Sequence, residues 1–107
     1  MKTDMFDEII DLEEFAIEGK KPPKGCRYRI KIDKNKYVVD VPLMSGREIL
    51  NLAEKTPPEQ YMLFQKFRGG ENKRIELDEK VDFTTPGVEK FRTLPMDQTE
   101  GKNAQTI

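Results

Sequence analysis

The stretch from Ser45 to Phe67 restricts the fold most, because it encodes both the start and the stop of a helix. Ser45 and Glu48 have the spacing of a capping box, in which each side chain accepts a hydrogen bond from the backbone N–H of the other residue. An apolar stripe with helical spacing follows, at Ile49, Leu50, Leu52 and Ala53. Pro57 and Pro58 then lack the N–H that a helix needs. The pattern predicts a short helix that ends near Lys55 and packs its apolar face on a sheet.

The composition of the 107-residue chain predicts one domain with tails, because a chain of this length supports a single modest core. Its 19 basic and 20 acidic side chains leave a formal charge of −1, so no strong field favours nucleic acid or a membrane surface as a partner. No stretch has the apolar length of a membrane span or the apolar core of a signal peptide. We therefore expect a cytoplasmic protein.

The residue types also argue against an enzyme. The chain has no histidine, which is the commonest acid–base group and metal ligand, and Cys26 is its single cysteine. A lone cysteine forms neither a disulfide within the chain nor a cysteine metal cluster, and here it lacks a histidine to activate it. We expect no catalytic residue, no bound metal and no bound cofactor.

The acidic segment Asp4–Gly19 predicts an amphipathic helix that ends at Gly19. Helical spacing places Phe6, Ile9, Ile10, Glu13 and Ile17 on roughly one face, which Met5, Leu12 and Phe15 broaden. The basic, proline-containing stretch that follows predicts a linker, which places a domain boundary at residue 25. Two interpretations of this N-terminal arm stay open: it is disordered or loosely docked on its own domain, or it is a docking helix for a partner.

Alternating side chains predict strands on both sides of the central helix. The predicted strands are 27–32, 37–41, 61–67, a short one at 74–77, and 88–94. Val81 and Phe83 are the expected anchors of the loop before the last strand, and Phe91 is the expected core residue of that strand. Residues 96–107 have few large apolar side chains and predict a mobile, extended tail.

This order of elements is that of the ubiquitin-like β-grasp fold, an α+β fold with one helix packed on a mixed sheet of four to five strands. The sequence PPEQYMLF at residues 57–64 resembles the ubiquitin segment that follows its helix, PPDQQRLI. More closely, YRIKIDKNKYVVDVP, SGREILNLAEKTPPEQY, QKFRGG and PGVEKFRTLP resemble the bacterial multiubiquitin family, over about residues 12–101. We expect the N-terminal arm and linker at 1–25, the β-grasp domain at 26–95 and a flexible, processed tail at 96–107. Family members often carry tandem copies, whereas this sequence contains one copy.

The resemblance implies a protein modifier that is joined through its C-terminus to target proteins, in pathways associated with defence against phage. The implied partners are an E1-like adenylating enzyme that uses ATP, an E2-like conjugating enzyme, a processing peptidase and the targets. A competing hypothesis is a β-grasp interaction module that is never conjugated, and a sulfur carrier is a third. Genes for an E1, an E2 and a peptidase beside this one would favour the first hypothesis, and their absence the second.

The activated end of a ubiquitin-type donor is a glycine, because glycine alone admits close backbone approach in a narrow enzyme channel. This chain lacks a terminal Gly-Gly. Gly69 and Gly70 follow Arg68 as in ubiquitin, but they lie between two predicted strands and are interpreted as a turn. In the tail, Gly101 is the first candidate for the activated end, after removal of residues 102–107. Asn103, followed by the small Ala104, is the second.

Met62 and Phe64 form a predicted partner-binding site. Phe64 aligns with the residue at the centre of the main binding patch of ubiquitin, and Met62 lies two positions away on the same face of the strand. The alternative is that the N-terminal arm covers this face through Phe6, Ile9 or Phe15. The resemblance adds further candidates for binding the E1 or another partner, at Leu94, Asp97, Thr99 and Glu100.

Overall fold

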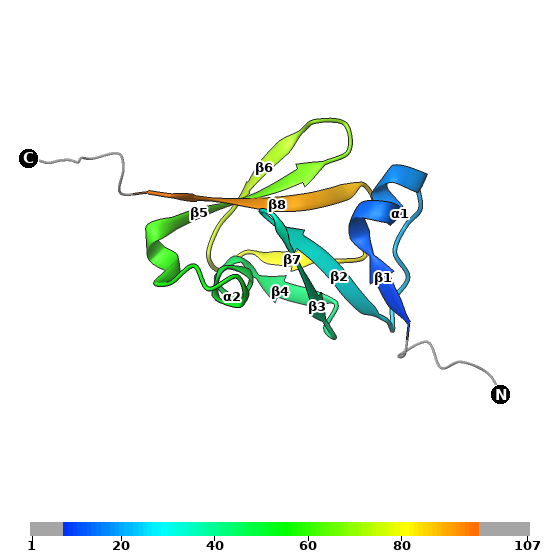
Figure 1. The fold of residues 1–107 in the computed structure, drawn as a ribbon, viewed down its shortest axis with the longest axis horizontal. Coiled ribbons are helices and arrows are strands. Elements are labelled where there is room, and N and C mark those ends of the chain that lie inside the picture. Colours follow the sequence, from blue (N-terminus) through cyan, green and yellow to red (C-terminus); the bar gives the residue numbers. More distant parts are fainter. Residues whose placement is uncertain (1–7, 97–107) are drawn as a thin grey trace, which may run out of the picture.

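The computed structural model describes residues 8–96 of the chain (Figure 1). From the N-terminus, its elements are β1 (Ile9–Asp11), α1 (Leu12–Glu18), β2 (Arg27–Ile32), β3 (Asn35–Val39), β4 (Leu43–Ser45), α2 (Gly46–Leu52), the 3-10 helix η2 (Pro58–Gln60), β5 (Tyr61–Phe67), β6 (Asn72–Ile75), β7 (Lys80–Asp82) and β8 (Val88–Pro95). Among the described residues, neither helix is long and apolar enough to span a bilayer.

Six strands form one mixed sheet in the order β1-β2-β8-β5-β6, with β3 paired to β2. β2 and β8 run parallel, with Ile32 opposite Phe91, whereas β5 runs antiparallel to β8 and to β6. This is the arrangement of the β-grasp fold: a hairpin is followed by a helix, and the last strand runs parallel to the first strand of the hairpin. The predicted α+β fold is therefore confirmed, in a sheet that is one strand larger because β1 joins it.

The core lies between α2 and one face of the sheet. Tyr28, Ile30 and Ile32 alternate along β2 and are each at most 1% exposed, and Ile49 and Leu50 of α2 are equally buried. Farther along the chain, the predicted anchors Val81, Phe83 and Phe91 are all buried. The rings of Phe83 and Phe91 meet edge to face with 6.4 Å between their centroids, an arrangement that aromatic quadrupoles favour. These outcomes confirm the predicted core residues.

Helix α2 begins as predicted and ends earlier than predicted. The Ser45 hydroxyl accepts a hydrogen bond from the Glu48 N–H at 3.1 Å, and the Glu48 carboxylate accepts one from the Ser45 N–H at 2.9 Å, so the capping box is present. The helix ends at Leu52, and Glu54 adopts a left-handed backbone with φ of 62°. The chain thus leaves the helical conformation before it reaches the prolines, and Lys55 is not part of the helix.

The N-terminal segment differs most from prediction. Residues 9–11 are a strand parallel to β2, and the helix begins only after Asp11, whose carboxylate caps it by accepting the Glu14 N–H at 3.2 Å. The predicted apolar stripe is confirmed only in part: Ile10 and Leu12 are buried as predicted, but Ile9 and Ile17 are 37% and 53% exposed. Ala16, which the predicted stripe did not include, is buried. The predicted end is confirmed, since Gly19 terminates α1 in a left-handed conformation.

Segment 9–18 packs within the domain. β1 pairs with Arg27–Arg29 on the side of β2 opposite β3, and β8 meets that same side only at Ile32 (Figure 1). β2 and β8 therefore diverge toward the start of β2, and β1 with α1 occupies the space between them, where α1 packs on β8. Buried Ile10 and Leu12 belong to the same core cluster as Tyr28. This segment is neither disordered nor loosely docked.

An ion network holds the segment to the outer face of the hairpin. The buried Asp11 carboxylate lies 2.8 Å from Lys36 Nζ and 3.6 Å from Arg29 Nη1, and Glu13 lies 3.3 Å from Lys36 Nζ. Burial raises the pKa of Asp11, but the hydrogen bonds from Lys36 and the Glu14 N–H outweigh it, so the pKa of Asp11 is lowered overall. The network stabilises the fold while Asp11 is ionised and loses that contribution as the pH falls below about 4.

Candidate functional site

Met62, Phe64 and Leu94 lie together on the outer face of the sheet, and we call them the outer patch. Leu63 and Gln65, which alternate with Met62 and Phe64 along β5, are buried on the inner face of the sheet. Met62 and Phe64 therefore point to the outer face. Leu94 is the cross-strand partner of Met62, and cross-strand partners share a face. The patch is partly solvent-accessible, with Leu94 40% exposed. The structure thus brings these three predicted contact residues together.

The outer patch borders a shallow hollow of about 160 Å³. Phe64, Asn72, Arg92 and Leu94 line it, so its walls come from β5, β6 and β8. Of the arm residues proposed to cover this face, Phe15 packs instead against the core cluster, Ile9 is 37% exposed in β1, and Phe6 lies outside the described residues. Among residues 8–96, therefore, neither of the described arm residues covers the outer patch.

Basic side chains flank the outer patch at its Phe64 end. The register places Arg74 and Arg92 opposite Phe64 on its two neighbouring strands, and Lys66 opposite Lys90. Cross-strand partners point to the same face, so these cations share the face of the patch. An apolar centre with a basic rim suits a partner surface that is apolar and acidic. The sequence prediction missed this rim because it depends on strand register, although the alternation Lys90, Arg92, Leu94 indicates the shared face.

The described chain ends next to the outer patch. Pro95, the last residue of β8, is opposite Tyr61, and the Met96 N–H donates a hydrogen bond to the Gln60 carbonyl at 2.8 Å. The other predicted site residues lie outside the described residues: Asp97, Thr99 and Glu100 as partner contacts, and Gly101 and Asn103 as processing sites. Their roles stay predictions.

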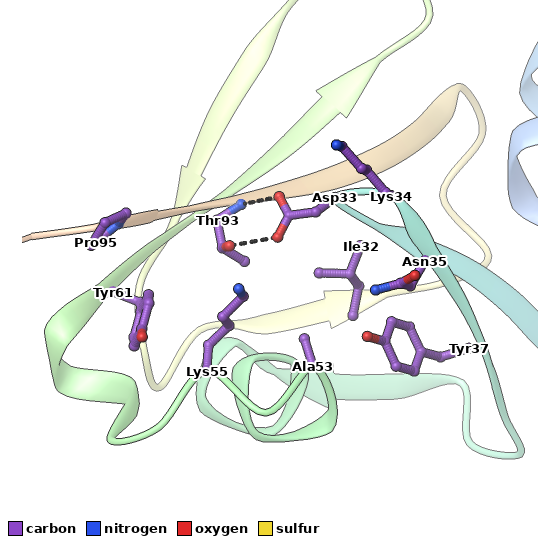
Figure 2. Close-up of a pocket in the computed structure, with 10 residues that line it drawn as sticks. All are labelled: Ile32, Asp33, Lys34, Asn35, Tyr37, Ala53, Lys55, Tyr61, Thr93 and Pro95. Carbon is purple, nitrogen blue, oxygen red and sulfur yellow. Dashed lines mark hydrogen bonds between the residues drawn. The ribbon is translucent and has the colours of Figure 1, made fainter.

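A second hollow, of about 580 Å³, lies at the end of the β2–β3 hairpin (Figure 2). The Asp33 carboxylate accepts hydrogen bonds there from the Thr93 N–H at 2.9 Å and the Thr93 hydroxyl at 2.6 Å, which ties the hairpin turn to β8. Lys55 extends into the hollow, with its ammonium 5.9 Å from the centre of the Tyr61 ring. The sequence prediction missed this hollow, because it joins a turn, a helix end and a strand that are far apart in the chain.

The other sequence features have structural roles. Gly69 and Gly70 lie in the turn between β5 and β6, where Gly70 has φ of +97° and its N–H donates to the Phe67 carbonyl at 2.9 Å, so the predicted turn is confirmed. Cys26 is 4% exposed, and burial together with the nearby Glu8 raises the pKa of its thiol. A protonated, buried thiol is a poor nucleophile. Within residues 8–96, no cluster of acidic and cysteine side chains could hold a metal ion.

Comparison with known proteins agrees with the fold. No curated protein and no solved structure matches the chain. The sequence model of the multiubiquitin family matches residues 28–96, which comprise most of β2 and every element after it. β1 and α1 lie outside the matched region, although they contribute to the same core. Because the match covers more than half of the chain, this ubiquitin-like protein belongs to the multiubiquitin family.

Proposed function

We propose that this protein is a cytoplasmic modifier that is trimmed at its C-terminus, adenylated by an E1-like enzyme and conjugated to target proteins through an E2-like enzyme, in defence against phage. The chain itself catalyses nothing and binds no cofactor, and ATP is used by the E1. The observation that carries the proposal is membership of the multiubiquitin family, whose match ends at Met96 and leaves a distinct C-terminal segment after the β-grasp domain.

Two features of the described residues support this function. β8 ends at Pro95 next to the outer patch, so an enzyme that binds the patch is close to the point where the C-terminal segment begins. The domain also offers an apolar centre with a basic rim, a composition common in recognition surfaces. Binding of the domain and use of its C-terminus can therefore be accomplished by one enzyme surface.

The proposed chemistry has four steps, each performed by a partner. The peptidase hydrolyses the peptide bond after Gly101, which consumes one water and releases residues 102–107. The E1-like enzyme joins the new carboxylate to the AMP moiety of ATP and releases pyrophosphate. The acyl group then passes to an enzyme nucleophile with release of AMP, and finally to a target amine, where it forms an amide and frees the nucleophile.

The processing step is tested by the intact mass of the protein after incubation with the peptidase encoded beside it. Cleavage after Gly101 is expected, with loss of residues 102–107, and a loss of residues 104–107 would move the activated end to Asn103. With E1-like and E2-like enzymes and ATP, target bands should then shift on a gel. Gly101→Phe should abolish the shift, whereas Gly69→Ala in the β5–β6 turn should leave it unchanged. An unchanged mass would reject the precursor hypothesis.

A second candidate function is a non-conjugated β-grasp interaction module. The outer patch favours it, because an accessible apolar site with a basic rim serves binding whether or not the C-terminus is activated. The two functions differ in one measurement. A module of this kind binds its partner without any ATP-dependent gel shift, and Gly101→Phe leaves that binding intact.

Replacing Phe64 by alanine is expected to weaken binding to the E1-like or E2-like partner at least about tenfold, because aromatic side chains dominate contact energies when they are desolvated. The free energy of unfolding should change little, since Phe64 is only partly buried on the outer face. Titration calorimetry and chemical unfolding measure the two effects. Val41→Ala, at an exposed apolar residue away from the outer patch, is the control. Severe unfolding of Phe64→Ala would make Phe64 a core residue instead.

A further inference from the structure

β3 presents an open edge of the sheet. β2 pairs with one side of it, and among residues 8–96 no strand pairs with the other side. In Figure 1, β1 and β3 flank β2 on opposite sides, so β3 lies at the margin of the sheet. Tyr37 and Val39 pack against the core, whereas Val38 points to the outer face and is 45% exposed. An open strand edge with an exposed apolar residue can pair with another strand.

The sequence of this edge is complementary to itself. When the segment Lys36–Asp40 is aligned antiparallel with the same segment of a second copy, Val38 of one copy lies opposite Val38 of the other. Lys36 then lies opposite Asp40, and the two-fold axis produces this ion pair twice. Lys36 and Val38 alternate along β3 and so share its outer face, and Asp40 is the first residue after the strand. The register that places Lys36 opposite itself would instead bring like charges together.

The charges around Lys36 also favour an incoming carboxylate. The ion network on this face contains three basic groups, Arg29, Lys31 and Lys36, and two acidic groups, Asp11 and Glu13. Its net charge is therefore +1 within one copy. Asp40 is exposed and comes directly after β3, so Asp40 of a second copy would bring the network to neutrality.

We propose that two copies of this protein associate through their β3 strands, which pair antiparallel about a two-fold axis at Val38. The two sheets become one continuous sheet, Val38 is buried against its counterpart, and Lys36 of each copy binds Asp40 of the other. This association uses neither the outer patch on β5 and β8 nor the C-terminus. The proposed association is therefore tested independently of the proposed conjugation.

Sedimentation equilibrium of the full chain tests the proposal. We expect a reversible, concentration-dependent dimer that weakens as salt is added, because the ion pairs lie at the surface. Asp40→Lys and Val38→Lys should each raise the dissociation constant at least about tenfold, since both place positive charges against each other across the axis. Leu94→Lys, at an exposed apolar residue of β8, should leave it unchanged.

A charge exchange makes the register itself testable. Lys36→Glu and Asp40→Lys should each fail to self-associate, while an equimolar mixture should form a heterodimer, in which both cross-strand pairs again join opposite charges. Circular dichroism verifies that each variant is folded. If Lys36→Glu does not fold, Val38→Lys alone tests the interface. Any of three results would overturn the proposal. The protein stays monomeric to about 1 mM, the dimer is insensitive to Asp40→Lys, or the dimer is abolished by Leu94→Lys.

Discussion

Replacing Leu12 by alanine is expected to lower the free energy of unfolding by about 2–5 kcal/mol, the range for large-to-small substitutions in a packed core. Leu12 is 3% exposed and belongs to the core cluster that contains Tyr28, Ile30 and Phe91. Its removal leaves a cavity where α1 packs between β2 and β8. Urea unfolding followed by circular dichroism measures the change.

The control for Leu12→Ala is Ile17→Ala in the same helix. Ile17 is 53% exposed, so its truncation should change the free energy of unfolding by less than about 0.5 kcal/mol. If both variants were as stable as the parent chain, segment 9–18 would be a detachable arm, as the sequence pattern predicts. If Leu12→Ala alone is destabilised, the stable unit extends beyond the matched region at residues 28–96.

The elements that the sequence predicts correctly have strong local signals. The capping box at Ser45 and Glu48 fixes the start of α2 without help from the rest of the chain. Alternation along 27–32 and 61–67 identifies β2 and β5 with their inward residues, because one face of each strand packs on the core. Local chemistry and tertiary packing agree at these positions, which is why the β-grasp order could be predicted.

The elements that the sequence does not predict depend on distant partners. β1 pairs with β2, and the acidic segment around it also has helical spacing, so the pattern predicts one helix over the whole segment. Asp11, with Glu14 three residues later, is a local signal for a helix start, but it does not reveal the strand before it, because that strand needs β2 as its partner. β4 and β7 have three residues each and pair across a long stretch of chain, with Met44 opposite Val81. Strands this short are too brief for an alternating pattern to identify them.

The candidate site also has a part that the sequence predicts and a part that it does not. Alternation along β5 predicts that Met62 and Phe64 share a face, and the structure places them so. Leu94 joins them only through the β5–β8 register, and the basic rim at Arg74 and Arg92 needs both neighbours of β5 to be known. Residues on one strand can therefore be assigned to a face from sequence, whereas a surface that spans three strands requires their register.

Replacing Gly46 by alanine is expected to lower the free energy of unfolding by at least about 2 kcal/mol, because the added methyl group overlaps the backbone. A Cβ atom at Gly46 would lie 2.4 Å from the Glu76 carbonyl oxygen and 3.2 Å from Ile75 Cγ2. The neighbouring chain is held there by two hydrogen bonds, from the Gly46 N–H to the Glu79 carbonyl at 3.0 Å and from the Arg47 N–H to the Leu77 carbonyl at 2.9 Å. Backbone that is fixed in this way cannot move aside without losing those bonds.

The direction of this effect makes the measurement decisive. In an ordinary helix, glycine to alanine is stabilising by about 0.5–1 kcal/mol, because alanine restricts the unfolded chain. Gly69→Ala is the matched control, since a Cβ there meets nothing within 4 Å and Gly69 does not have a positive φ. Thermal and urea unfolding should show Gly46→Ala strongly destabilised and Gly69→Ala nearly unchanged. A Gly46→Ala variant as stable as the parent would mean that residues 76–79 are not held against the start of α2, and that the helix is secured by its capping box and its apolar face alone.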